Sequence, residues 1–155
     1  MPADLPRILV VEDDPNDLEL TLTALREGRI ANEIDAVRDG DAALDYLFRR
    51  GPFAGKPASR IAVVLLDLKL PKVDGLDVLR AIKADPVLHS TPVVVLTSSK
   101  EEKDLVRSYE LGVNAFVVKP VDFPEFIESV KQVGLFWAVL NEPPPRRSSA
   151  TAGAP

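Results

Sequence analysis

The chain has 155 residues, of which 46% are hydrophobic and 28% charged, the balance of an ordinary globular protein. That length fits one domain and leaves little for a second. The formal net charge of −5 argues against the basic surface that binds nucleic acid, and no apolar run is long enough to span a bilayer. Cysteine is absent and the start lacks the basic and apolar regions of a secretory signal, so we expect a cytoplasmic protein.

Five short apolar runs rich in Val, Ile and Leu alternate with amphipathic stretches. The runs cover residues 8–11, 33–37, 61–66, 93–96 and 115–118. Such a rhythm is typical of repeated strand–helix units and predicts a parallel α/β sheet. The third and fourth runs are apolar without alternation, as expected for central strands that helices cover on both faces.

Between these runs, apolar residues recur at the spacing of one helical face. They are Leu18, Leu22 and Leu25, then Leu44, Leu47 and Phe48, then Leu76, Leu79 and Ile82, then Leu105 and Tyr109. Asp14 before Pro15 is a predicted N-cap of the first helix, and Asp74 of the third. Residues 51–60 contain two glycines and two prolines and are expected to form an irregular surface loop.

Polar residues follow the predicted strands where each one ends. The first run is followed by Glu12 and Asp13, the third by Asp67, the fourth by Thr97 and the fifth by Lys119. Ligands of open parallel sheets bind at the carboxyl ends of the strands. The sequence therefore predicts three carboxylates, a hydroxyl and an ammonium group at one edge of the sheet.

Three carboxylates in one place require a cation. At an effective dielectric constant of about 20, two carboxylates about 5 Å apart repel each other by roughly 3 kcal/mol, more than Lys119 alone offsets for all three. Oxygen ligands without histidine or cysteine favour a hard cation, and Mg²⁺ suits a site that also binds phosphate. A carboxylate in such a site can attack phosphorus and form an aspartyl phosphate.

Four separated segments carry a resemblance to a known family. Residues 10–15 (VVEDDP), 67–75 (DLKLPKVDG), 97–99 (TSS) and 119–120 (KP) resemble the receiver domains of two-component response regulators, and the likeness covers about residues 7–133. The resemblance implies a flavodoxin-like α/β fold, a doubly wound five-stranded parallel sheet of order 2-1-3-4-5 with five helices. The last of these helices would be extended.

The resemblance also implies a role for each residue at the strand ends. Asp67 would be the phosphoacceptor and a Mg²⁺ ligand, Asp13 a direct ligand and Glu12 a ligand through water. The backbone carbonyl of Lys69 would complete the protein's metal ligands. Taken singly, each acid has a simpler explanation as a solvated residue, and Asp67 as part of a turn, but their conjunction favours function.

Thr97 and Lys119 would hold the phosphoryl oxygens, and Thr97 and Phe116 stand at the family's switch positions. Phe116 has a simpler explanation as a half-buried strand aromatic, and it lacks the hydroxyl of the commoner tyrosine. His89 has no second histidine for a metal site and is expected at the surface.

The predicted function is that of a single-domain response regulator. A partner histidine kinase would phosphorylate Asp67, and the signal would leave through phosphorylation-dependent protein contacts. Such a protein performs its own phosphotransfer and slow autodephosphorylation and is not a turnover enzyme. The alternatives are a phosphotransfer shuttle or phosphate sink, and a scaffold that works without phosphate. A phosphohydrolase with an aspartyl nucleophile is disfavoured because Lys69 stands where such enzymes have an acid.

Residues 1–141 are predicted to form the receiver with its extended helix, and residues 142–155, rich in Pro, Ser and Ala, a disordered tail. Residues 51–60 and 136–144 resemble parts of stand-alone regulators that are paired with bacterial phytochromes. That likeness implies a light-sensing kinase, a bacteriophytochrome, as the phosphodonor.

The final predicted helix begins near Asp122 and becomes apolar on every side beyond Gly134. One face of a sheet does not cover such a segment, and prolines at 143–145 end the helix. A second copy of the chain is the simplest cover, which predicts a homodimer. The predicted interface residues are Leu135, Phe136, Trp137, Val139 and Leu140.

Overall fold

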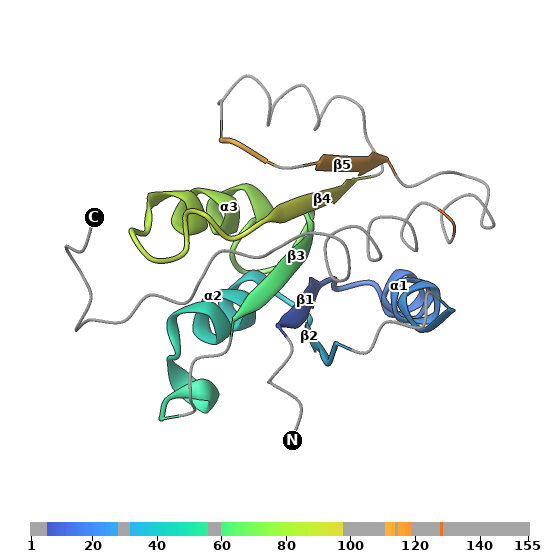
Figure 1. Ribbon diagram of the computed structural model, residues 1–155, viewed down its shortest axis with the longest axis horizontal. Coiled ribbons are helices and arrows are strands. Elements are labelled where there is room, and N and C mark those ends of the chain that lie inside the picture. The colour runs from blue at the N-terminus through green and yellow to red at the C-terminus, as the bar shows by residue number, and fades with distance from the viewer. Residues whose placement is uncertain are drawn as a thin grey trace.

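A computed structural model of the protein describes residues 6–27, 32–55, 60–97, 111–113, 115–118 and 128. Strands and helices alternate along the described chain up to residue 97 (Figure 1). The elements are β1 (Arg7–Val11), α1 (Pro15–Glu27), β2 (Ile34–Val37), α2 (Gly40–Phe48), the 3₁₀ turn η1 (Gly51–Phe53), β3 (Ile61–Asp67), α3 (Gly75–Ala84), β4 (Val93–Thr97) and β5 (Ala115–Val118).

The strands form one sheet in the order β2-β1-β3-β4-β5, and every neighbouring pair is parallel. The predicted parallel α/β architecture is confirmed. β3 lies at the centre and is buried from Ala62 to Asp67, as its unbroken apolar run requires. The edge strand β2 has only Val37 buried, which explains its weaker apolar pattern in the sequence.

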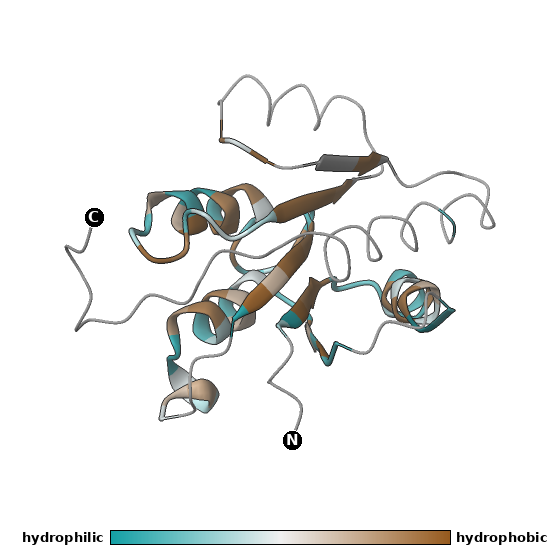
Figure 2. Cartoon of the chain, in the orientation of Figure 1, coloured by the Kyte–Doolittle hydropathy of each residue, from teal (hydrophilic) through white to brown (hydrophobic). Residues whose placement is uncertain are grey.

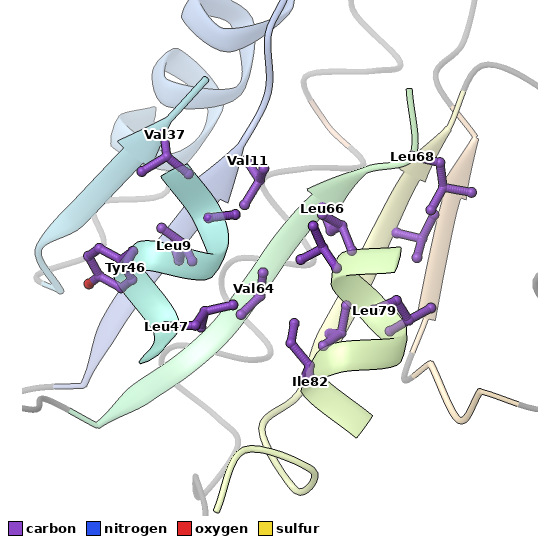
Figure 3. Packing of buried hydrophobic residues seen from close by; sticks show 14 residues of the cluster. Leu9, Val11, Val37, Tyr46, Leu47, Val64, Leu66, Leu68, Leu79 and Ile82 are labelled. Atoms are coloured by element: carbon purple, nitrogen blue, oxygen red, sulfur yellow. The ribbon is translucent and has the colours of Figure 1, made fainter. Parts of the chain in front are cut away.

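Helices cover both faces of the sheet. In β1, Leu9 and Val11 belong to a hydrophobic cluster with α2 and α3, whereas Ile8 and Val10 belong to a second cluster with α1. Alternate residues of a strand point to opposite faces, so α1 lies on one side and α2 and α3 lie on the other. The central strands are brown in Figure 2, while the helices show both colours. Figure 3 shows the first cluster, with α2 and α3 packed over the sheet.

The first helix is capped as predicted, and the third is not. Asp14 Oδ1 accepts hydrogen bonds from the backbone N–H groups of Asn16 (2.8 Å) and Asp17 (3.1 Å). Asp74 stands at the N-cap position of α3, but its side chain makes no capping hydrogen bond. The backbone carbonyl of Asp74 accepts from Asp77 and Val78 instead.

The loop predicted at residues 51–60 is more ordered at its start than expected. It begins with η1, and the Phe53 ring packs edge-on against Tyr46 of α2, with ring centroids 5.2 Å apart. Residues 56–59 lie outside the described part. So do the helix predicted around Leu105, the tail at 142–155 and the five predicted dimer residues. Of the helix predicted beyond Asp122, the structure describes Glu128, which is helical and exposed. Within the described residues, no helix has the length and apolar character that a membrane span needs.

Candidate metal centre

Three carboxylates converge at the carboxyl edge of the sheet, as predicted. Val11, the last residue of β1, is the register partner of Leu66 in β3, so the residues that follow them lie side by side. One oxygen each of Glu12, Asp13 and Asp67 lies within 4.8 Å of the other two. Glu12 and Asp67 are buried, at 0% and 7% exposure, whereas Asp13 is partly exposed.

This arrangement fits a hard divalent cation. Carboxylates less than about 5 Å apart repel one another by roughly 3 kcal/mol a pair at an effective dielectric constant of about 20, and burial of two of them reduces screening by water. A cation among them turns that repulsion into attraction. The three oxygen donors suit Mg²⁺ or a similar ion. Such an ion keeps several water ligands, and because Asp13 is partly exposed, water can reach the site from that side.

Backbone N–H groups orient two of the carboxylates. The N–H of Lys69 donates to Asp67 Oδ1 at 3.1 Å, and the N–H of Asp14 donates to Glu12 Oε2 at 3.3 Å. In both cases the donor lies two residues after the acid. The local turn that follows each strand therefore helps to hold its carboxylate toward the shared centre.

The strand order places Asp67 between the ends of β1 and β4. β1, which carries Glu12 and Asp13, lies on one side of β3, and β4 lies on the other with Leu96 opposite Asp67. Thr97 is the last residue of β4, so its backbone is at this same edge. Its side chain is outside what the structure describes.

The structure describes some of the other residues that the sequence singled out, and not others. The Lys69 side chain is exposed. Phe116 of β5 is the register partner of Val95 in β4, and its side chain is not described. Lys119 lies outside the described residues. His89 is exposed in the connection from α3 to β4, as expected of a surface residue.

The sequence reasoning missed the residues that follow β2. Arg38 Nη2 donates to the backbone carbonyl oxygen of Asp13 at 3.1 Å, and Asp39 caps α2 by accepting from the N–H of Ala42 at 2.7 Å. Asp39 before the helix that starts at Gly40 is a helix-start signal, so this cap could have been predicted from the sequence. Nothing in the sequence indicated that Arg38 reaches the first strand's loop.

The acid cluster lies at the carboxyl ends of parallel strands. Comparison with known proteins shows which family has this arrangement. A model of the response regulator receiver domain matches residues 8–131. The chain belongs to the response regulator receiver domain family. Glu12, Asp13 and Asp67, which form the cluster, all lie within the matched residues of this receiver.

The receiver is similar in sequence to response regulator Rcp1 of Synechocystis sp. (strain ATCC 27184 / PCC 6803 / Kazusa). The two are 41% identical over 130 residues, which cover 84% of this chain and 87% of Rcp1. A solved structure of the Mn²⁺-bound form of response regulator Rcp1 superposes with a TM-score of 0.82 at 38% identity, covering 90% of this chain and 99% of that one.

Two further solved structures are similar to this receiver. The bacteriophytochrome response regulator AtBRR is 61% identical, with a TM-score of 0.74 and coverage of 89% of this chain and 99% of that one. The phosphorylated cyanobacterial phytochrome response regulator RcpA is 40% identical, with a TM-score of 0.82 and coverage of 91% and 99%. Both of these similar structures are named as response regulators of phytochromes.

Proposed function

We propose that this receiver accepts a phosphoryl group on Asp67 from a partner histidine kinase in a Mg²⁺-dependent reaction. It then signals through protein contacts that depend on phosphorylation. The observation that carries the proposal is the convergence of Glu12, Asp13 and Asp67 within 4.8 Å at the carboxyl edge of the sheet. Support also comes from relatives whose structures are described as phosphorylated and as Mn²⁺-bound.

Asp67 is the proposed nucleophile because of its place in the sheet. It lies between the strand that carries the other two acids and the strand that ends in Thr97. A carboxylate oxygen of Asp67 attacks phosphorus, the new P–O bond forms an aspartyl phosphate, and the P–N bond to the kinase histidine breaks. The electron pair of that bond leaves with the imidazole nitrogen.

The metal would be held by Asp13 and Asp67 directly, by Glu12 through water and by the backbone carbonyl of Lys69. When bound, Mg²⁺ neutralises the carboxylates and stabilises charge on the transferring phosphoryl group. Thr97 and Lys119 are proposed to hold the phosphoryl oxygens by a hydroxyl and an ammonium group. We propose Thr97 and Phe116 as the residues that pass the change to the protein surface.

The proposed kinase partner is a bacteriophytochrome. The support is the likeness to AtBRR at 61% identity and to RcpA, both named as response regulators of phytochromes. We further propose that residues 1–141 are a five-helix receiver with an extended last helix, that 142–155 are a disordered tail and that the protein acts in the cytoplasm without binding nucleic acid.

We also propose a homodimer, on the apolar pattern at the end of that last helix. The interface would be formed by Leu135, Phe136, Trp137, Val139 and Leu140. A Phe136→Glu, Trp137→Glu double variant would then be monomeric in light scattering at concentrations where the wild type is dimeric. A monomeric wild type, or a variant that remains dimeric, contradicts this interface.

Mass spectrometry of the intact protein tests the proposed phosphorylation. The protein is incubated with Mg²⁺ and a small acyl phosphate, and the same mixture with excess chelator serves as the control. We expect the mass of one phosphoryl group to be added only when Mg²⁺ is present. Equal phosphorylation with and without chelator would exclude the metal from the reaction, and no phosphorylation would exclude the function.

A further inference from the structure

The segment Arg38–Gly40, which joins β2 to α2 and is called the β2–α2 corner below, contacts both loops that carry the acid cluster. Arg38 Nη2 donates to the backbone carbonyl oxygen of Asp13 at 3.1 Å. The backbone N–H of Gly40 donates to the carbonyl oxygen of Pro71 at 3.3 Å. One short segment thus connects the loop of Asp13 with the loop that follows Asp67.

An ion pair adds a second connection to the loop after Asp67. Lys72 Nζ lies 3.5 Å from Asp39 Oδ2, while the other oxygen of Asp39 accepts the capping hydrogen bond from Ala42. Asp39 therefore joins the loop to the first turn of α2. Lys72 has a φ of 68°, a backbone conformation that L-residues seldom adopt, so the loop is bent at the residue that makes the ion pair.

Gly40 shows how closely the corner packs on this loop. A Cβ built on Gly40 would lie 1.9 Å from the carbonyl oxygen of Val73, a backbone atom that moves only if the loop moves. At its other end the loop is held by α3, because Gly75 N–H donates to the Leu68 carbonyl oxygen at 3.0 Å. The loop after Asp67 is thus fixed between the first turns of two helices.

We propose that the β2–α2 corner is a positioning element that sets the separation of Asp13 and Asp67 and thereby the affinity for Mg²⁺. The inference rests on the proposed function, since it assigns the corner a role toward the metal of that site. Arg38 fixes the loop of Asp13, and Lys72 with Gly40 fixes the loop whose Lys69 N–H orients Asp67. Partners one layer behind metal ligands commonly tune affinity in this way.

The direction in which Mg²⁺ affinity changes when these side chains are removed distinguishes positioning from a simple charge effect. Arg38 and Lys72 are cations near a site for a cation, so their charges alone oppose Mg²⁺ binding. Removing those charges would then tighten binding. If instead the two side chains position the loops, removing them loosens the acid cluster and weakens binding.

The test is a calorimetric titration of the full-length protein with MgCl₂ alone. We expect an Arg38→Met, Lys72→Met double variant to bind Mg²⁺ about three- to tenfold more weakly than the wild type. This is less than the roughly ten- to hundredfold effect usual for partners behind metal ligands, because both side chains are largely exposed. An Arg38→Lys, Lys72→Arg double variant keeps both charges and hydrogen-bond donors and should bind within about twofold of the wild type. Unchanged or tighter binding by the methionine variant overturns the proposal.

Arg50→Met is the matched control. Arg50 pairs with Asp45 at 3.6 Å near the other end of α2 and is about as exposed as Lys72 (57% against 63%). Its loss should leave Mg²⁺ affinity unchanged, and a weakening equal to that of the methionine double variant would also overturn the proposal. A wild type that binds no Mg²⁺ would instead remove the proposed metal site itself.

Urea denaturation without metal distinguishes positioning from a general loss of stability. The methionine double variant should unfold at nearly the same urea concentration as the Arg50→Met control while differing from it in Mg²⁺ affinity. Equal losses of stability and of affinity in both variants would show that the corner supports only the fold.

Discussion

Gly75 approaches Asp67 so closely that a side chain at this position would collide with the end of β3. A Cβ on Gly75 would lie 2.5 Å from the carbonyl oxygen of Asp67 and 2.5 Å from the Cα of Leu68. Both atoms belong to the backbone, so no flexible side chain can move aside. The start of α3 is therefore packed directly beneath the residue proposed to carry the phosphoryl group.

Gly75→Ala should destabilise the protein by about 1–3 kcal/mol, because the added methyl group forces the strand end and the helix apart. Urea denaturation gives the free energy of unfolding. Gly55→Ala is a useful comparison, since nothing lies within 4 Å of its added Cβ. The strain of placing an alanine at a φ of 81° is then the source of any destabilisation. A Gly75→Ala variant as stable as the wild type would contradict the close packing.

Asp13→Ala should weaken Mg²⁺ binding by at least about tenfold while leaving Asp67 in place, because a direct carboxylate ligand is lost. Glu19→Ala removes the same charge from an exposed position of α1 and serves as the control. The measurement is a calorimetric titration of each variant with MgCl₂. Equal affinities of Asp13→Ala and the wild type would rule out Asp13 as a ligand.

A polar network joins β1, β2 and α2 and gives stability a dependence on pH. Arg7 donates to both carboxylate oxygens of Asp35, at 2.7 and 2.9 Å, and the Tyr46 hydroxyl donates to the same carboxylate. The hydrogen bonds from Arg7 lower the pKa of Asp35. Burial, and then the hydrogen bond to Asp35, raise the pKa of Tyr46 from 10.0 to about 12.

The direction of each pKa shift fixes where stability is lost. The contribution of Tyr46 is complete below pH 10.0, where the phenol is neutral in both states, and disappears as the pH rises to about 12. The contribution of Asp35 is present above its unfolded pKa of 3.8 and is lost as the pH falls through the lower folded pKa. Between these limits the network should be insensitive to pH.

Tyr46→Phe removes the hydroxyl group but keeps the ring that packs in the core (Figure 3). We expect a loss of about 1.5–3 kcal/mol near neutral pH, since a hydrogen bond to a charged carboxylate is lost. The difference in unfolding free energy between wild type and variant should shrink as the pH rises from 10.0 to about 12. A difference that stays constant or grows over that interval would contradict the raised pKa.

Much of the fold was predictable because its signals are local. Apolar runs identify the strands, and Asp14 before Pro15 identifies the start of α1, where the predicted cap is confirmed. Asp74 stands at an N-cap position as Asp14 does, but it makes no side-chain cap, and the N–H groups of Asp77 and Val78 bond to its backbone carbonyl instead. The residue type at a cap position does not by itself decide whether its side chain makes the capping hydrogen bond.

The acids of the candidate site were predictable because parallel strands end at one edge, so residues directly after them must meet. The side chains that hold the loops of these acids were not predictable. Arg38 reaches the Asp13 carbonyl and Lys72 reaches Asp39 across loops that only the sheet order brings together. An arginine or lysine in a polar stretch carries no sign of its partner, since most such residues face water.

The proposal that Asp67 is the phosphoacceptor is tested most directly by trapping the phosphorylated residue. After incubation with Mg²⁺ and a small acyl phosphate, hydride reduction converts the acyl phosphate of an aspartate to an alcohol, and peptide mass mapping locates it. Asp67→Asn, which keeps the shape but lacks the nucleophilic oxygen, is the control. We predict reduction at Asp67 alone in the wild type and at no residue in the variant. Trapping at Glu12 or Asp13, or undiminished phosphorylation of the variant, would contradict the assignment.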